Sequence, residues 1–167
     1  MNPKQKFVAV LGMLTLTALL ASCTMMKEGS EATMDLQTAK GIAMATEDET
    51  AALVPPENVG DQTQKQTAHL FGCADGRLSW PGLTTVTLIG DVDAEAMIEV
   101  IASAWEKKDG VVVKRLKTRQ GAPRVDMTGT QGDSYSASIW APGTELKIDS
   151  FSPCFELEEG QHPSDEY

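Results

Sequence analysis

The sequence predicts an α+β domain in which one helix packs on a mostly antiparallel sheet of about five strands. Three observations predict this fold: one amphipathic helical segment, several segments with the alternation of β-strands, and short Gly- or Asp-rich turns between the later strands. Short turns favour antiparallel neighbours, so a single helix is left to cover one face of the sheet. A length of 167 residues allows one ordinary domain.

The first expected strands precede the helix. Residues 84–89, Thr-Thr-Val-Thr-Leu-Ile, place β-branched side chains in near alternation and end at Gly90, as a strand should. An earlier strand is expected through His69, Leu70 and Phe71.

The helix is marked by its cap, its apolar spacing and its end. Asp93 is a good N-cap residue, and Gly110 suits the C′ position. Lys107 and Lys108 lie in the last turn, where positive charge suits the helix dipole. Apolar residues at helical spacing form the stripe that should lie on the sheet: Met97, Ile98, Ile101, Ala104 and Trp105.

Four further strands follow the helix and form a meander. Turn residues separate them, notably in Gly129–Asp133 and Ala141–Gly143. The expected strands are Val111–Lys117, Pro123–Thr128, Tyr135–Ala141 and Leu146–Phe151.

The first 23 residues have the pattern of a secretory signal. Lys4 and Lys6 form a basic start, and the apolar run of residues 7–21 is shorter than the roughly 20 residues of a membrane-spanning helix. The run ends in Leu20–Cys23, Leu-Ala-Ser-Cys, which resembles the lipobox of bacterial lipoproteins. The alternative is an ordinary signal peptide with an incidental cysteine.

The lipobox resemblance implies a lipid anchor. It implies cleavage before Cys23, attachment of diacylglycerol to the Cys23 thiol and, in many bacteria, a further acyl chain such as palmitate on the new amino group. Two or three acyl chains hold a protein firmly to a bilayer. We therefore expect a protein on the extracytoplasmic face of the cell membrane.

Charge and composition divide the chain into four parts. Residues 1–22 are the signal peptide, residues 23–65 are the acylated Cys and a flexible acidic tether, residues 66–155 are the α+β domain, and residues 156–167 are a flexible acidic tail. The tether region shows no sustained apolar stripe, and the tail holds five acids and no Lys or Arg. An alternative role for both ends is recognition of a basic partner.

Two cysteines remain once Cys23 is acylated. Cys73 and Cys154 lie near the two ends of the expected domain, and leftover cysteines of an exported protein usually pair. A bridge that closes so long a loop stabilises a fold by roughly 4 kcal/mol in the chain-entropy model. Two free thiols are the alternative.

Several segments together resemble small actinobacterial lipoproteins of the LppA-like kind. The resemblance is carried by the lipobox, the acidic tether, Trp80–Val86, the helix end Trp105-Glu106, and Ser150–Phe155 with the acids that follow it. It covers most of residues 66–155. It implies an envelope location and a fold of this type, and it supplies no catalytic residues.

Composition and motifs argue against several function classes. A net charge of −10 is unsuited to general nucleic-acid binding. His69 is the only histidine of the expected domain, no Gly-x-Ser-x-Gly surrounds a serine, and Walker and dinucleotide motifs are absent. Asp91 and Asp93 suit a turn and a helix cap better than a cation site. We therefore expect no enzyme activity, no metal and no cofactor.

Basic residues gather after the helix and form a candidate binding patch. In a lipid-anchored protein, such a surface suits an envelope protein or an anionic wall polymer. The alternative is a solvated hairpin whose bases guard a sheet edge or pair with the protein's own acidic tail. The patch consists of Lys114, Arg115, Lys117, Arg119 and Arg124.

The anchor, the tether and the missing catalytic set predict a membrane-anchored, non-enzymatic interaction or binding module of the bacterial cell envelope. The alternative is a carrier of a small ligand or lipid between helix and sheet, which requires a large apolar cavity. Trp105 is expected in the core, whereas Trp80 and Trp140 precede Pro-containing turns and are expected to be exposed.

Overall fold

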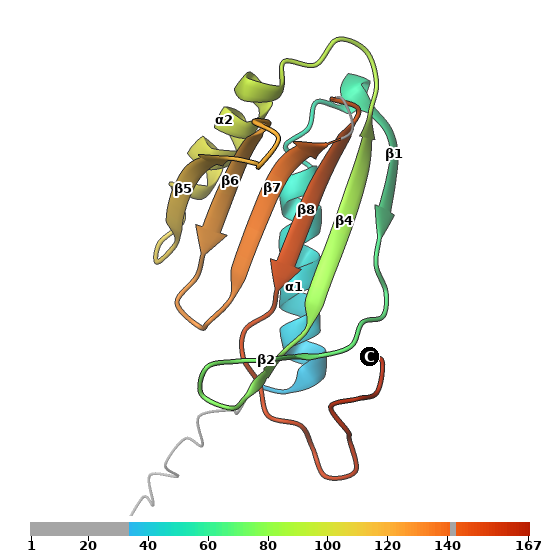
Figure 1. Ribbon diagram of the computed structural model, residues 1–167, viewed down its shortest axis with the longest axis vertical. Helices are drawn as coiled ribbons and strands as arrows, with labels where there is room; N and C mark the ends of the chain where they lie inside the picture. Colours follow the sequence, from blue (N-terminus) through green and yellow to red (C-terminus); the bar gives the residue numbers. More distant parts are fainter. Residues whose placement is uncertain (1–33, 141–142) are drawn as a thin grey trace, which may run out of the picture. The chain divides into compact units, whose positions relative to one another are not determined.

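The computed structural model describes residues 34–140 and 143–167 (Figure 1). The signal peptide, the lipobox and Cys23 lie outside these residues. Within the described ranges, no helix combines the length and the apolar character that crossing a membrane requires.

The described chain forms two α-helices and two antiparallel sheets. The main sheet has six strands in the order β1-β4-β8-β7-β6-β5, and β2 pairs with β3 separately. The predicted α+β fold is confirmed, with a second helix that the sequence pattern did not predict. The elements are α1 (Leu36–Ala51), a 3-10 helix (Pro56–Asn58), β1 (Val59–Gln64), β2 (Phe71–Gly72), β3 (Leu78–Ser79), β4 (Pro81–Leu88), α2 (Ala94–Trp105), β5 (Val112–Lys117), β6 (Pro123–Thr128), β7 (Ser134–Trp140) and β8 (Glu145–Phe151).

Both helices lie on the same face of the main sheet, behind the strands in Figure 1. α1 packs on β4 and β8, and α2 packs on β5, β6 and β7. In the described ranges, the opposite face carries no helix. The main sheet therefore has one face covered by helices and one face that is open to solvent.

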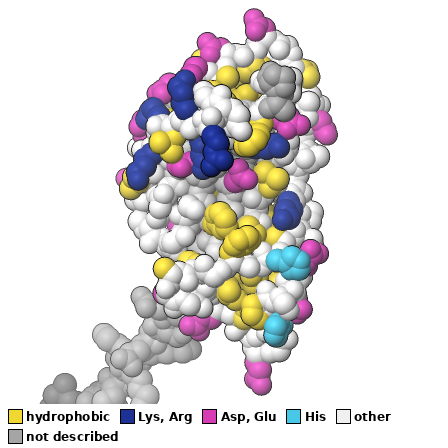
Figure 2. Space-filling view, viewed as in Figure 1, with side chains coloured by type: hydrophobic (Ala, Val, Ile, Leu, Met, Phe, Trp, Pro, Cys, Tyr) yellow, Lys and Arg dark blue, Asp and Glu magenta, His cyan; other side chains and the backbone are white. Residues whose placement is uncertain are grey.

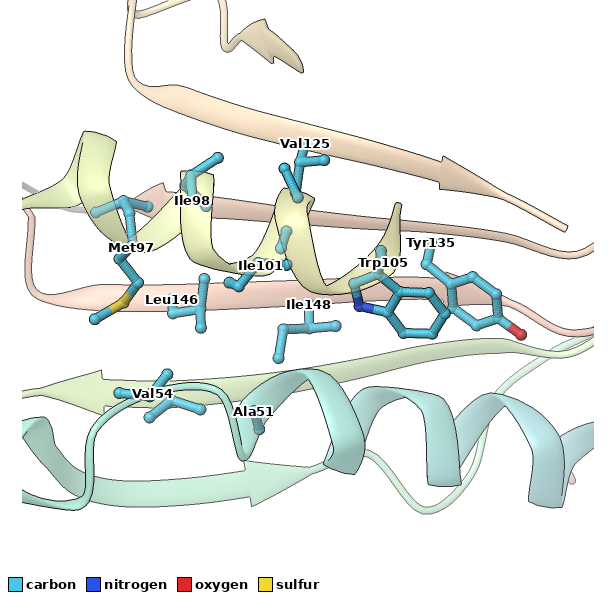
Figure 3. Close-up of a cluster of buried hydrophobic side chains, with 14 of the residues drawn as sticks. Ala51, Val54, Met97, Ile98, Ile101, Trp105, Val125, Tyr135, Leu146 and Ile148 are labelled. Carbon is cyan, nitrogen blue, oxygen red and sulfur yellow. The ribbon is translucent and has the colours of Figure 1, made fainter. Parts of the chain in front are cut away.

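α2 covers its half of the sheet with large apolar side chains (Figure 3). Asp93 caps the helix by accepting a hydrogen bond from the backbone N–H of Ala96 at 3.0 Å, as its N-cap assignment predicts. Trp105 is buried and stacks on Tyr135 of β7 with 5.9 Å between ring centroids, so its predicted place in the core is confirmed. The buried residues of the helix are Met97, Ile98, Ile101, Ala102 and Trp105.

α1 lies within the segment expected to be a flexible tether, so that prediction is wrong for residues 36–64. Asp35 caps this helix through a 2.7 Å hydrogen bond from the backbone N–H of Thr38. The buried face has little apolar contrast with the exposed face, and for this reason its period is hard to see in the sequence. β1 then pairs with β4 and joins the same folded unit. The buried residues of α1 are Leu36, Ala39, Ala43, Glu47, Thr50 and Ala51.

The acidic C-terminal segment is also part of the fold. The backbones of Ala68 and Tyr167 exchange hydrogen bonds of 2.9 and 3.0 Å. The Tyr167 carbonyl also accepts a 2.8 Å hydrogen bond from the indole of Trp80, which is fully buried against α1 and Phe155. The predictions of a flexible tail at residues 156–167 and of an exposed Trp80 are therefore wrong, because the tail closes over that indole.

The predicted disulfide between Cys73 and Cys154 is confirmed. It joins the turn that follows β2 to the segment after β8, with 6.4 Å between the two Cα atoms. Beside it, Leu78 of β3 and Phe155 form an antiparallel bridge. The small sheet is thereby fixed against the end of β8.

Candidate binding face

β7 lies near the middle of the main sheet and turns a row of short hydroxyl side chains away from the helices. Side chains alternate along a strand, so the residues between the core positions face the open side. The core positions are Tyr135, Ala137 and Ile139. The outward positions are Ser134, Ser136, Ser138 and Trp140.

The strand register places polar and charged residues on both sides of this serine row. Ser138 pairs with Arg124 of β6 and Lys147 of β8, and Ser136 pairs with Asp126 and Asp149. Ser134 pairs with Thr128 and Phe151. We call these six residues, together with the serine row and Trp140, the uncovered face.

Two members of the serine row, Ser134 and Ser136, line a groove. Ser136 and Ser138 are only 6% and 2% exposed, because longer side chains stand on the strands on either side. A second pocket, of about 430 Å³, shares Ser134 and Phe151 with the groove and extends to the disulfide. The groove has a volume of about 380 Å³, and its lining includes Arg124, Asp126, Thr128, Ser134, Ser136 and Asp149.

The groove carries charges of both signs. Arg124 donates through Nε to Oδ1 of Asp126 at 2.5 Å. Desolvation in the groove raises the pKa of Asp149 above its usual range, although Arg124, Lys147 and the Ser136 hydroxyl act in the opposite direction. Hydrogen-bond donors and acceptors therefore lie side by side in the groove.

Exposed aromatic rings stand at both ends of the uncovered face. Trp140 is 42% exposed, which confirms its predicted exposure, and its Nε1 donates to Oγ of Ser138 at 2.7 Å. The ammonium of Lys147 lies 5.2 Å from the centroid of the same ring. At the other end, Phe151 and Phe71 are 39% and 56% exposed and meet edge to face at 5.6 Å. Figure 2 shows this side of the sheet, with yellow hydrophobic groups interrupting a largely white polar surface.

The structure divides the predicted basic patch between the two faces of the sheet. Lys114 and Arg124 lie on the uncovered side, where the register aligns them with Asp126 and Ser138. Arg119 is exposed in the turn between β5 and β6. The remaining two patch residues of β5 lie on the helix side, because neighbouring positions of a strand alternate between faces.

Those two bases on the helix side are paired with acids of α2 and the residue that follows it. Arg115 donates to Glu99 at 2.7 Å and to Glu106 at 2.5 Å, and its hydrogen bond to Glu99 lowers the pKa of Glu99 to about 2. Lys117 contacts Glu95 at 2.6 Å. The predicted patch is therefore not one positive surface, and binding by its members stays a prediction.

The remaining candidate metal-binding and catalytic side chains make contacts within the fold. Cys73, Asp75 and Cys154 place their potential metal-ligand atoms within 4.8 Å of one another, but both sulfurs belong to the disulfide. The Asp75 carboxylate pairs with the guanidinium of Arg77 at 2.8 Å, and the hydrogen bond from Arg77 lowers the pKa of Asp75. His69 is exposed and lies 3.4 Å from the Glu166 carboxylate, outside the groove.

The serine row is the part of the candidate site that the sequence analysis missed. Its signal is nevertheless present, because serines recur at period two through a segment already expected to be a strand. The period does not reveal that both neighbouring strands place charged side chains beside the serines. It also does not reveal that both helices pack on the opposite face.

Comparisons with protein-family models, with curated proteins and with solved structures find no match for this chain. The resemblance to LppA-like lipoproteins therefore stays a prediction. The fold and the groove define the chain as an α+β protein with a candidate binding groove on an open sheet.

Proposed function

We propose that this chain is a lipid-anchored, non-enzymatic binding module of a bacterial cell envelope, which holds an envelope component on its uncovered face. The observation that carries the proposal is the open side of the six-stranded sheet, with its groove and its exposed aromatic ends. The lipobox at Leu20–Cys23 supports attachment to the extracytoplasmic side of the cell membrane.

The uncovered face is suited to binding because its sheet and its aromatic side chains are held by contacts within the fold. α1 and α2 fix the sheet from behind through a contiguous buried core. Trp140 is held by its hydrogen bond to Ser138, and Phe151 is held against Phe71. Side chains that are already positioned lose little conformational entropy when a ligand binds. Exposed aromatic groups of this kind are typical of interaction surfaces.

The carrier alternative places a ligand between a helix and the sheet. In the described residues, the space between α2 and the sheet is filled by packed side chains, among them Ile101, Trp105 and Ile148 (Figure 3). A ligand there would have to displace this core. The groove on the other side is open already, which favours surface binding.

In-cell crosslinking of the lipidated chain tests the proposed function. A photo-reactive amino acid replaces Thr128, which is exposed in the lining of the groove, and a matched control carries it at Val100, which is exposed on α2. We expect a defined adduct from position 128 and none from position 100. Equal labelling from both positions, or no adduct from position 128, would overturn the proposal.

A second control tests the anchor. The variant Cys23→Ser removes the thiol that lipidation requires, so the chain should leave the membrane fraction and lose the adduct. A Cys23→Ser protein that stays in the membrane fraction and keeps the same adduct would contradict the lipid-anchored part of the proposal.

A further inference from the structure

The uncovered face has a polar centre and aromatic ends. Its centre is the groove, where Arg124, Asp126 and Asp149 flank the serine row. Trp140 lies six residues along β7 from Ser134, the partner of Phe151, so the two aromatic ends are about 20 Å apart at the usual strand rise. The uncovered face is therefore long and narrow, with an aromatic ring at each end.

This arrangement is unlike the centre of a protein–protein interface. Such interfaces place large apolar groups at the centre, deplete it of charged residues and put polar groups at the rim. Here the order is reversed, because Asp126 and Asp149 lie in the middle and Trp140 and Phe151 lie at the ends.

The charges also disfavour a polyanion. Two carboxylates, Asp126 and Asp149, line the groove, and the guanidinium of Arg124 is already hydrogen-bonded to the first of them. The chain as a whole carries a net charge of −10. A polymer rich in phosphate would therefore bring its negative charge close to two carboxylates, and the basic groups beside them, Arg124 and Lys147, already interact with those carboxylates.

A neutral polyol is chemically complementary to both the polar centre and the aromatic ends of the uncovered face. Sugar hydroxyls both donate and accept, so they match carboxylates, a guanidinium and serine hydroxyls placed side by side. Pyranose rings also have an apolar face that packs on an exposed aromatic ring. Trp140 offers such a ring at one end of the uncovered face, and Phe151 with Phe71 offers another at the other end.

We infer that the uncovered face binds an uncharged glycan strand of the envelope, with sugar hydroxyls in the groove and sugar rings on Trp140 and Phe151. This inference rests on the proposed function, since it names the component that the binding module holds.

Binding of the full lipidated chain in detergent micelles to immobilised wall glycan strands, stripped of peptides and of phosphate polymers, tests the inference. Trp140→Ala should weaken binding about tenfold, because it removes a stacking ring, and Asp149→Asn should weaken it several-fold. Val100→Ala and Glu95→Gln alter exposed side chains on α2 and should bind like the natural chain. Thermal unfolding of each variant confirms that the fold is intact, and Trp140→Phe keeps an aromatic ring and should keep most of the affinity.

Three results would overturn the inference, and they separate it from the proposed function. A position-128 adduct that is a protein would leave the binding module standing and remove the glycan. A second such result is binding only to glycan strands that still carry phosphate polymers, with an affinity that falls steeply when the NaCl concentration is raised about tenfold. This result would assign the uncovered face to a polyanion. Equal affinity in Trp140→Ala, Asp149→Asn and the two control variants would place the glycan elsewhere.

Discussion

α1 and α2 lie side by side on the same face of one sheet, but they pack on it by different means. α2 uses large apolar side chains, with Ile101 fully buried and Trp105 stacked on Tyr135. α1 uses alanines that allow close approach, together with one buried carboxyl group, Glu47. α1 also has apolar contacts, because Leu36 and two of its alanines belong to a buried cluster with Trp80 and Phe155. The two helices therefore differ in that α1 adds a satisfied polar cluster to its hydrophobic contacts.

The polar cluster of α1 is fully hydrogen-bonded. The Glu47 carboxyl accepts from Oγ1 of Thr84 at 2.7 Å, from Oγ of Ser150 at 2.5 Å and from Nε2 of Gln64 at 3.2 Å. In the described part of the chain, every buried side-chain nitrogen or oxygen has a partner. Gly82 of β4 leaves room for this cluster, because a Cβ there would overlap the Glu47 carboxyl.

Ile101→Ala should give the largest effect, a loss of about 2–5 kcal/mol in the free energy of unfolding. The side chain is fully buried between α2 and the sheet, so its removal leaves a cavity in the apolar core. Urea unfolding followed by circular dichroism measures the loss. Val100→Ala, on the exposed side of the same helix, should stay within about 0.5 kcal/mol. Equal losses for the two variants would contradict the assignment of the covered face.

Gly82→Ala should destabilise the fold by about 1–3 kcal/mol through overpacking. The added methyl group would meet the Glu47 carboxyl, the Ser150 hydroxyl and the Trp80 ring, which are all buried. Gly72→Ala is the matched control, because a Cβ at this strand position meets no atom within 4 Å. If unfolding in urea shows the same stability for both variants, α1 does not pack on β4 as closely as the polar cluster requires.

Asp93→Ala should cost about 1 kcal/mol, since it removes the cap from the first turn of α2. The same unfolding experiment measures the loss, and Asp93→Asn should recover most of it because Asn caps equally well. A loss that Asn does not recover would mean that the charge of Asp93, rather than its hydrogen bond to Ala96, is what the helix needs.

The contrast between the helices explains what the sequence can predict. The sequence marks α2 by its cap and its apolar period, and both point to the same element. The predicted C-terminal signals are wrong, because α2 ends at Trp105. Lys107 and Lys108 therefore lie beyond its last turn, and Gly110 is not at its C′ position. The strand expected at Pro123–Thr128 has the bounds of β6. α1 escapes such reasoning because its buried face is built mainly from Ala, Thr and Glu, residue types that are as common on exposed surfaces.

The candidate binding site shows the same limit on what a local sequence pattern can predict. The basic patch groups residues that are close in sequence, but strand alternation sends Lys114 and Arg115 to opposite faces. The groove depends instead on residues far apart in sequence, such as Asp126 and Asp149, which the β6-β7-β8 register brings to either side of Ser136. Register between strands is a property of the whole sheet, so a local pattern does not reveal it.

Glu47→Gln should have the smallest effect on stability at acidic pH, because the amide has nearly the shape of the protonated carboxyl. The main effect of this substitution should be a change in how the free energy of unfolding depends on pH. Desolvation raises the pKa of Glu47 above the ordinary value of 4.5, although the hydrogen bonds from Ser150, Thr84 and Gln64 oppose the shift. The folded state therefore keeps this proton to a higher pH than the unfolded state does.

The sign of the pH dependence follows from that proton. The stability of the natural chain relative to Glu47→Gln should be greatest below pH 4.5 and should fall as pH rises from there through the raised pKa. Carboxyls with lowered pKa values, such as Glu99 at about 2, contribute stability that is lost in acid. This loss is the same in both proteins, so it cancels in the difference between their free energies of unfolding. Urea unfolding of both proteins at a series of pH values measures the difference, with Glu57→Gln as an exposed control. A flat difference would mean that α1 is held by its alanines and Leu36 alone, so that the contrast between the two helices would be one of side-chain size and not of chemistry.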